Sequence, residues 1–167
     1  QGIAFTDEFP VDLYGNDIPN DPYGADFEGI AVDGSGNWWM VDEYRPAIYH
    51  FTPAGELINR YVPQGTAAAV GAAVGAYGIE ALPRVYAQRR VNRGFEAVAI
   101  DGNTLYAFIQ SPLDNPDLPN DNTSKASGWC RILAFNIVTK QVTGEYLYPL
   151  FEADRGVDKI GDAVCTG

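Results

Sequence analysis

An internal repeat constrains the fold of this sequence more than any other feature. The residues FEGIAVDG at 27–34 return as FEAVAIDG at 95–102, with five of the eight positions identical. Each copy is followed by further short apolar runs separated by turn residues, which is the pattern of a four-stranded β-propeller blade. The copies lie further apart than the roughly 40–50 residues of a typical blade. An Ala/Gly-rich insertion at 64–94 accounts for the excess.

The repeat predicts an all-β chain with the architecture of a β-propeller, of which about two blades and the start of a third are present. We place the first blade at 25–63, the insertion with a short helix at 64–94, the second blade at 95–149 and the start of the third at 158–167. Propeller sheets bury both faces against their neighbours, so an incomplete ring leaves two faces uncovered. We therefore expect the remainder of the propeller from the same precursor or from another chain. The alternative left open is a small β-sandwich with a chance repeat.

Composition narrows the classes of partner. The formal net charge is −11, and hydrophobic residues make up 46% of the 167 residues. Nucleic-acid binding depends on clustered Lys and Arg, so we expect no nucleic-acid partner and bound ions that are cations. No apolar run approaches the roughly 20 residues of a membrane span. The two cysteines, Cys130 and Cys165, leave open a disulfide of an exported protein or two isolated thiols.

Carboxylates gather on one face of the predicted propeller. Glu28, Glu96 and Asp162 stand at the starts of first strands, which line the central channel, and Asp42 and Glu43 follow a second strand on the same face. Crowded carboxylates repel one another, and Ca²⁺ relieves this repulsion because it takes roughly six to eight oxygen ligands. These five residues are therefore the predicted metal ligands, with calcium as the divalent metal.

Other polar side chains map to the same face. They are Tyr44, Arg45, Asn92, Arg93, Gln110 and Ser111. Arginine binds oxyanions through two parallel hydrogen bonds, so the group Arg89, Arg90 and Arg93 near a metal suits a phosphate or carboxylate ligand. Alternatively, Arg89, Arg90 and Arg93 pair with glutamates as internal salt bridges. The single histidine, His50, lies in mid-strand away from the axis, and we expect neither a zinc site nor a Ser-His-Asp triad.

Several of these segments resemble the phytase-like esterase domain family. They are FEGIAVD at 27–33, WMVDEY at 39–44, NRGFEA at 92–97, QSPL at 110–113, RIL at 131–133, GEY at 144–146 and IGD at 160–162. The resemblance implies an exported bacterial protein with a propeller fold, in which recurrent acidic residues serve phosphoester hydrolysis. It carries those acidic positions onto Glu28, Asp42, Glu43, Glu96 and Asp162. Motifs of the true β-propeller phytases are not evident, so inositol phosphate is not assumed.

Together these observations predict an extracellular or periplasmic, calcium-dependent phosphoester hydrolase that acts on a small molecule. Glu28 and Glu96 would ligate the metal or act as general base, and Arg93 would stabilise the developing charge. The predicted substrate-binding residues are Tyr44, Arg45, Asn92, Gln110 and Ser111. Two alternatives remain. One is a gluconolactonase-type, metal-dependent ester or lactone hydrolase. The other is a non-catalytic, calcium-stabilised binding or structural propeller.

Overall fold

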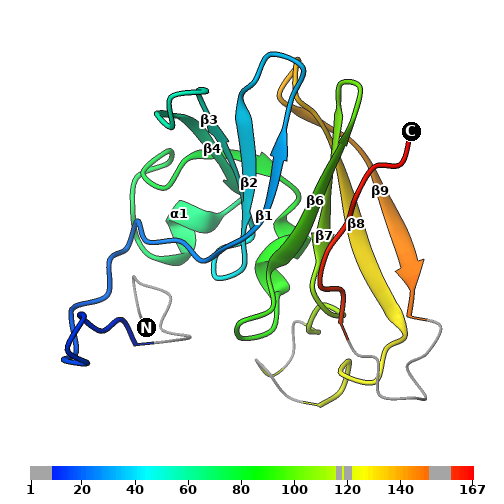
Figure 1. Cartoon of the computed structure of the whole chain (residues 1–167). Helices are drawn as coiled ribbons and strands as arrows, with labels where there is room; N and C mark the ends of the chain where they lie inside the picture. Colours follow the sequence, from blue (N-terminus) through cyan, green and yellow to red (C-terminus); the bar gives the residue numbers. More distant parts are fainter. Residues whose placement is uncertain (1–8, 116–117, 119–121, 151–158) are drawn as a thin grey trace.

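The chain folds into two β-sheets with almost no helix (Figure 1). A computed structural model describes residues 9–115, 118, 122–150 and 159–167. The first sheet contains β1 (Phe27–Val32), β2 (Trp38–Asp42), β3 (Ala47–Phe51), β4 (Leu57–Pro63) and β5 (Ile79–Leu82). The second contains β6 (Phe95–Asp101), β7 (Thr104–Ile109), β8 (Trp129–Asn136) and β9 (Gln141–Pro149). In the sequence the short helix α1 (Thr66–Ala69) lies between β4 and β5, and the 3-10 helix η1 (Arg84–Gln88) lies between β5 and β6. None of the described helices has the length and apolar character needed to cross a membrane.

The strands β1–β4 and β6–β9 form two antiparallel meanders whose turns are set by short polar side chains. In the β1–β2 turn, the Asp33 carboxylate accepts hydrogen bonds from the backbone N–H groups of Ser35 and Asn37 and from the Trp39 indole. In the β8–β9 turn, the Asn136 side chain accepts from the N–H groups two and three residues on. These local bonds satisfy backbone donors that the strands leave unpaired, and so favour tight hairpins.

The two sheets pack against each other through β1 and β6, which lie side by side at the centre of the molecule (Figure 1). The approach is close at Gly29, where a Cβ atom would lie 3.0 Å from the backbone nitrogen of Val98. Behind this contact, Tyr61 of β4 meets Phe135 of β8 with ring centroids 4.9 Å apart, and both rings are fully buried. The main hydrophobic core therefore lies between the sheets and fixes how their ends meet.

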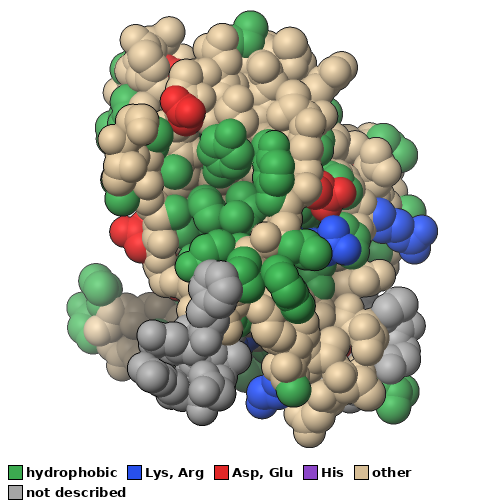
Figure 2. Space-filling view, turned by 90° about the vertical axis from the view of Figure 1, so that its right-hand side faces the viewer, with side chains coloured by type: hydrophobic (Ala, Val, Ile, Leu, Met, Phe, Trp, Pro, Cys, Tyr) green, Lys and Arg blue, Asp and Glu red, His purple; other side chains and the backbone are tan. Residues whose placement is uncertain are grey.

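Both outer sheet faces carry exposed apolar side chains. On the first sheet, Ile30 is 55% exposed, Val32 58% and Trp38 40%. Figure 2 shows hydrophobic side chains gathered on the side of the molecule formed by the second sheet, where Tyr146 and Tyr148 of β9 are exposed. The described part of the chain thus has an apolar core and two further apolar faces.

The structure confirms the expectation of a mostly β chain, since the described residues form two sheets. These residues do not form a closed ring. The strand β5 was not expected, since it lies inside the insertion and pairs in parallel with β4. Within the insertion at 64–94, where a short helix was expected, the structure has the four-residue helix α1 and the 3-10 helix η1. Residues 159–167 form no strand, and residue 158 lies outside the described residues. The two thiols are free, with Cys130 buried and Cys165 exposed.

Candidate functional site

Three carboxylates converge where β1 begins and β2 ends. Asp26, Glu28 and Glu43 each offer an oxygen within 4.8 Å of the others. Asp26 and Glu28 flank Phe27, and residues two apart along an extended chain point to the same side. Glu43 follows β2 directly, and its N–H donates to the Asp26 carbonyl at 2.9 Å. The antiparallel pairing of β1 with β2 therefore brings these side chains together.

The second sheet adds a fourth carboxylate through a bridging amide. Gln110, which follows β7, donates from Nε2 to Glu43 at 2.7 Å and to Glu96 of β6 at 2.5 Å. Its own N–H donates to the Gly94 carbonyl at 2.8 Å. Gly94 lies against the backbone of Glu43, and a Cβ there would be 1.9 Å from the Glu43 carbonyl oxygen. Only glycine allows this approach, which holds the two sheets in register at the acidic cluster, defined as Asp26, Glu28, Glu43 and Glu96.

The electrostatics of the acidic cluster centre on Glu43, which is 3% exposed. Burial raises the pKa of Glu43 to about 8, and the charges of Glu96, Asp26 and Glu28 act in the same direction. A bound cation would remove both penalties, because it replaces lost hydration and neutralises like charges. Two oxygens on one Ca²⁺ ion can stand up to about 5 Å apart. The all-oxygen set of Asp26, Glu28 and Glu43 therefore fits a hard cation.

Asp42 and Asp162 have other surroundings. The Asp42 carboxylate is fully buried and accepts from the N–H groups of Asp26, Tyr44 and Arg45, while Tyr49 donates its hydroxyl to the other oxygen. Burial raises the pKa of Asp42 to about 6. These contacts make Asp42 the organiser of the β2–β3 turn.

Asp162 lies on the segment that follows the second sheet. It is exposed and accepts a hydrogen bond from the N–H of Ala163 at 2.7 Å. Nearby, the Ile160 N–H donates to the Gln110 carbonyl at 2.7 Å. The segment therefore passes beside Gln110, but Asp162 is not among the three carboxylates that share ligand distance.

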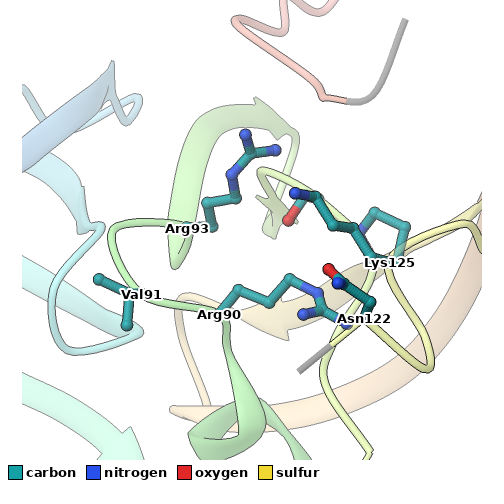
Figure 3. A pocket seen from close by; sticks show the side chains of 7 residues that line it. Arg90, Val91, Arg93, Asn122 and Lys125 are labelled. Atoms are coloured by element: carbon teal, nitrogen blue, oxygen red, sulfur yellow. The ribbon is translucent and has the colours of Figure 1, made fainter. Parts of the chain in front are cut away.

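A second feature at this end is a cavity of about 170 Å³, which we call the basic pocket (Figure 3). Its lining residues are Arg90, Val91, Arg93, Ser111, Pro112, Asn122 and Lys125. Figure 3 shows Arg90 and Arg93 on the segment that precedes β6, with Asn122 and Lys125 on the facing loop. Arg93 and Ser111, both predicted from sequence, therefore face one cavity.

The other predicted substrate-binding residues are placed differently. Tyr44 and Arg45 line a separate cavity of about 250 Å³. Arg45 is almost fully buried, donates to the Pro22 carbonyl at 2.9 Å and lies 4.6 Å from the Tyr77 ring centroid. Asn92 has a φ of 51°, a left-handed conformation that Asn tolerates better than most residues. We therefore assign Asn92 to the tight turn before β6.

The arginines before β6 have partners outside the acidic cluster. Arg90 forms an ion pair with Asp114 at 3.0 Å. Arg89 donates to the carbonyls of Tyr44 and Arg90, which ties this segment to the β2–β3 turn. These contacts position the basic pocket beside the cluster.

Sequence reasoning overlooked Asp26, Asn122 and Lys125 as site residues, whereas Arg90 had been grouped with Arg89 and Arg93 as a candidate oxyanion ligand. Asp26 had a readable signal, because it stands two positions before Glu28 on the same strand side. No sequence signal marked Lys125 or Asn122 as part of the site, since both lie in a long polar loop whose course depends on tertiary contacts.

Comparison with known proteins gives the family. The whole chain, residues 1–167, matches the family described as phytase-like, "Esterase-like activity of phytase". An "Uncharacterized secreted protein" of Arthroderma benhamiae is 31% identical over 147 residues, an alignment that covers 75% of this chain and 27% of that protein. The chain therefore spans about a quarter of the length of this curated relative. By its sequence the chain belongs to the phytase-like esterase family.

Proposed function

We propose that this chain forms part of an exported, metal-dependent hydrolase of phosphoesters, with calcium as the metal. The observation that carries the proposal is the convergence of Asp26, Glu28 and Glu43 within 4.8 Å beside Glu96. Membership of the phytase-like esterase family supports ester hydrolysis, and the secreted relative supports export to an extracellular or periplasmic location. The expected substrate is a small anionic ester.

Each group has a role in this mechanism. Asp26, Glu28 and Glu43 would hold the cation, which when bound polarises a phosphoryl oxygen and acidifies water. Glu96 is the general base that takes the proton of the attacking water, and Gln110 orients its carboxylate through the 2.5 Å hydrogen bond. Water oxygen bonds to phosphorus as the ester P–O bond breaks, and the alcohol leaves with a solvent proton. Arg93 neutralises charge that develops on the phosphoryl oxygens.

We further propose that the two sheets are neighbouring blades of a β-propeller, with the boundaries predicted from the sequence. Ile30 and Val32 of the first sheet correspond in the repeat to Val98 and Ile100 of the second. Val98 is covered by the first sheet, whereas Ile30 and Val32 are exposed. The two sheets are thus stacked in the same orientation. The face that is exposed in the first sheet is equivalent to the face that the second sheet buries against the first. This supports further blades, from the same precursor or another chain, on both outer faces.

The blade arrangement is testable by footprinting. In the intact protein, hydroxyl-radical labelling of Trp38 should be as low as that of the buried Trp39, while Tyr14, which is 90% exposed, should label fully. Labelling of Trp38 at the level of Tyr14 would contradict a neighbouring blade on this face.

Hydrolysis is tested on intact protein freed of metal with EDTA. We expect added Ca²⁺ to restore release of p-nitrophenol from p-nitrophenyl phosphate, and Glu96→Gln to lower kcat by about 100-fold, as loss of a general base does. Glu56→Gln is the matched control, because Glu56 is an exposed residue of the β3–β4 turn.

The outcomes separate the rival functions. Calcium-dependent cleavage of a lactone or carboxylic ester but not of the phosphoester would favour the gluconolactonase-type alternative. A calcium-dependent rise in melting temperature without any turnover would favour the structural propeller. Failure of Ca²⁺ to bind or to stabilise the protein would refute the metal site itself.

A further inference from the structure

We propose that Tyr49 and Arg60 serve the acidic cluster as positioning residues, and that they act through the buried carboxylate of Asp42. In this arrangement Asp42 anchors the backbone that carries the cluster and does not ligate the cation itself. The anchoring of the backbone needs no metal, whereas its effect on calcium binding rests on the proposed function.

Hydrogen bonds from the protein occupy both oxygens of the Asp42 carboxylate. Oδ1 accepts from the N–H groups of Asp26, Tyr44 and Arg45 at 3.2, 3.0 and 3.3 Å. Oδ2 accepts from the hydroxyl of Tyr49 at 3.2 Å. Asp42 is 0% exposed, so these donors take the place of the water that a buried charge has lost. A carboxylate has about four acceptor sites, and this one already has its donors within the protein.

Two carboxylates of the acidic cluster depend on this anchor. Asp26 donates its N–H to Asp42 directly, and the Glu43 N–H donates to the Asp26 carbonyl at 2.9 Å. Glu43 also lies in the chain between Asp42 and Tyr44, whose N–H the same carboxylate holds. Asp42 therefore fixes the end of the segment before β1 relative to the segment after β2. These two segments supply the Asp26 and Glu43 oxygens that lie within ligand distance.

Tyr49 of β3 contacts both the anchor and the cluster. Its hydroxyl donates to Asp42, and its ring meets the ring of Phe27 edge-on, with centroids 4.8 Å apart. Phe27 stands between Asp26 and Glu28 and lies opposite Asp42 in the pairing of β1 with β2. Tyr49 is 3% exposed, so both contacts are shielded from water. One buried side chain thus holds the strand that carries two of the carboxylates.

Arg60 of β4 continues this row of contacts. It lies opposite Tyr49 in the pairing of β3 with β4, so the two side chains share a face of the sheet. Its Nη1 donates to the Tyr49 hydroxyl at 3.2 Å, and its guanidinium carbon lies 5.5 Å from the centroid of the Tyr49 ring. Because the hydroxyl oxygen accepts from Arg60, its own proton is directed to Asp42, and bonds in such a chain strengthen one another.

The chemistry of the row indicates a role at the site rather than in stability. Buried charged groups are weak sources of stability, because well-packed apolar residues in their place are often neutral or stabilising. Groups that orient the ligands of a metal, in contrast, typically set its affinity. A carboxylate at position 42 is therefore explained by the need to hold Asp26 and Glu43 in fixed positions.

The first test is amide hydrogen exchange of the intact protein in EDTA, read by mass spectrometry for a peptide that contains Asp26. Tyr49→Phe removes only the hydroxyl, and we expect it to speed the exchange severalfold, because the anchor of the Asp26 N–H is loosened. Tyr61→Phe is the matched control. Tyr61 is 1% exposed in the same sheet, but it belongs to the core between the sheets and not to the cluster of Tyr49. It should change the exchange by less than about twofold.

Calorimetric titration with Ca²⁺ is the second test. We expect Asp42→Asn to weaken binding by about 10–100-fold, Tyr49→Phe by about tenfold and Arg60→Gln by about threefold, as for groups that orient metal ligands. In the Asp42→Asn background, Tyr49→Phe should weaken binding by less than about twofold further, because its hydroxyl acts through that carboxylate. Independent structural effects would add instead.

Three results would overturn the proposal. The first is an equal effect of Tyr49→Phe and Tyr61→Phe in both tests. The second is full additivity in the double variant. The third is weaker Ca²⁺ binding in Asp42→Asn with unchanged binding in Tyr49→Phe, since Asp42 would then itself be a ligand. If Asp42→Asn fails to fold, the comparison of Tyr49→Phe with Tyr61→Phe decides.

Failure of this proposal is distinguishable from failure of the proposed function. Faster exchange at Asp26 in Tyr49→Phe, in a protein that binds no Ca²⁺, would keep the anchor and refute the metal-dependent hydrolase. Unchanged exchange and unchanged Ca²⁺ affinity in Tyr49→Phe, in a protein that hydrolyses p-nitrophenyl phosphate with Ca²⁺, would do the reverse.

Discussion

The contact between Gly94 and Glu43 allows a sharp test of how the two sheets meet. In Gly94→Ala the new Cβ would lie 1.9 Å from the Glu43 carbonyl oxygen, 2.7 Å from its carbonyl carbon and 2.9 Å from its Cα. All three neighbours are backbone atoms, so no side-chain rotation relieves the clash. The β2–β3 turn must move by about 1 Å or more to reach an ordinary separation.

The loss of stability in Gly94→Ala follows from the contacts that this movement disrupts. Overpacking by one carbon costs about 1–3 kcal/mol, and the Gln110 N–H to Gly94 carbonyl hydrogen bond adds about 1 kcal/mol. We therefore expect Gly94→Ala to lower the free energy of unfolding by about 2–4 kcal/mol. Because Glu43 moves with the turn, calcium should bind this variant more weakly.

The measurement is urea unfolding of the intact protein in EDTA, followed by calorimetric titration with Ca²⁺. Gly34→Ala is the matched control, since Gly34 has ordinary φ and a Cβ there would meet no atom within 4 Å. We expect it to change stability by less than about 0.5 kcal/mol. If Gly94→Ala unfolds at the same urea concentration as the wild type and binds Ca²⁺ equally well, the packing of Glu43 on the second sheet is wrong.

Three further predictions concern titrating groups. Burial and neighbouring carboxylates raise the pKa of Glu43 to about 8, so without metal the stability should fall as pH rises from 4.5 to 8. With solvent screening the loss should be about 1–2 kcal/mol, and Glu43→Gln should flatten it in melting curves; equal slopes would contradict this. Burial lowers the pKa of His50, so its contribution is present above about pH 6.5 and lost below it. Melting temperatures between pH 7 and 5.5 should fall less in His50→Phe than in the wild type. Burial raises the pKa of Cys130 to about 11, so Ellman's reagent should modify only Cys165 in the folded protein; two fast thiols would refute this.

The sequence predicted the strands well where they form hairpins. The repeat and its turn residues placed the strands from β1 to β4 and from β6 to β9, because alternation and tight turns are local properties. The strand β5 was not predictable in the same way. β5 pairs in parallel with β4, so that Tyr61 lies opposite Ile79 and Pro63 lies opposite Leu82. The two strands are separated by part of the insertion, and a pairing of this kind has no tight turn whose residues could predict it.

Only part of the candidate site was predictable from the sequence. The alternation of side chains between the two sides of a strand explains which residues were predicted correctly. Glu28 and Glu96 occupy the same place in the two copies of the repeat, so their shared face was readable. Asp42 and Glu43 are adjacent, and adjacent residues at a strand end point to different sides. Glu43 therefore faces the cluster while Asp42 organises the turn. The position of Lys125 depends on the contacts of its loop, which no local pattern encodes.

The two copies of the repeat use the same backbone contact with different side chains. In the first copy the Glu43 N–H donates to the Asp26 carbonyl, and in the second the Gln110 N–H donates to the Gly94 carbonyl. The acidic pair of the first copy thus corresponds to a neutral pair in the second. Glycine is required at position 94 because the first copy packs onto it, and Gln110 supplies an amide donor that a carboxylate there would lack. The candidate site therefore arises where the copies differ, while the fold that positions it arises from what they share.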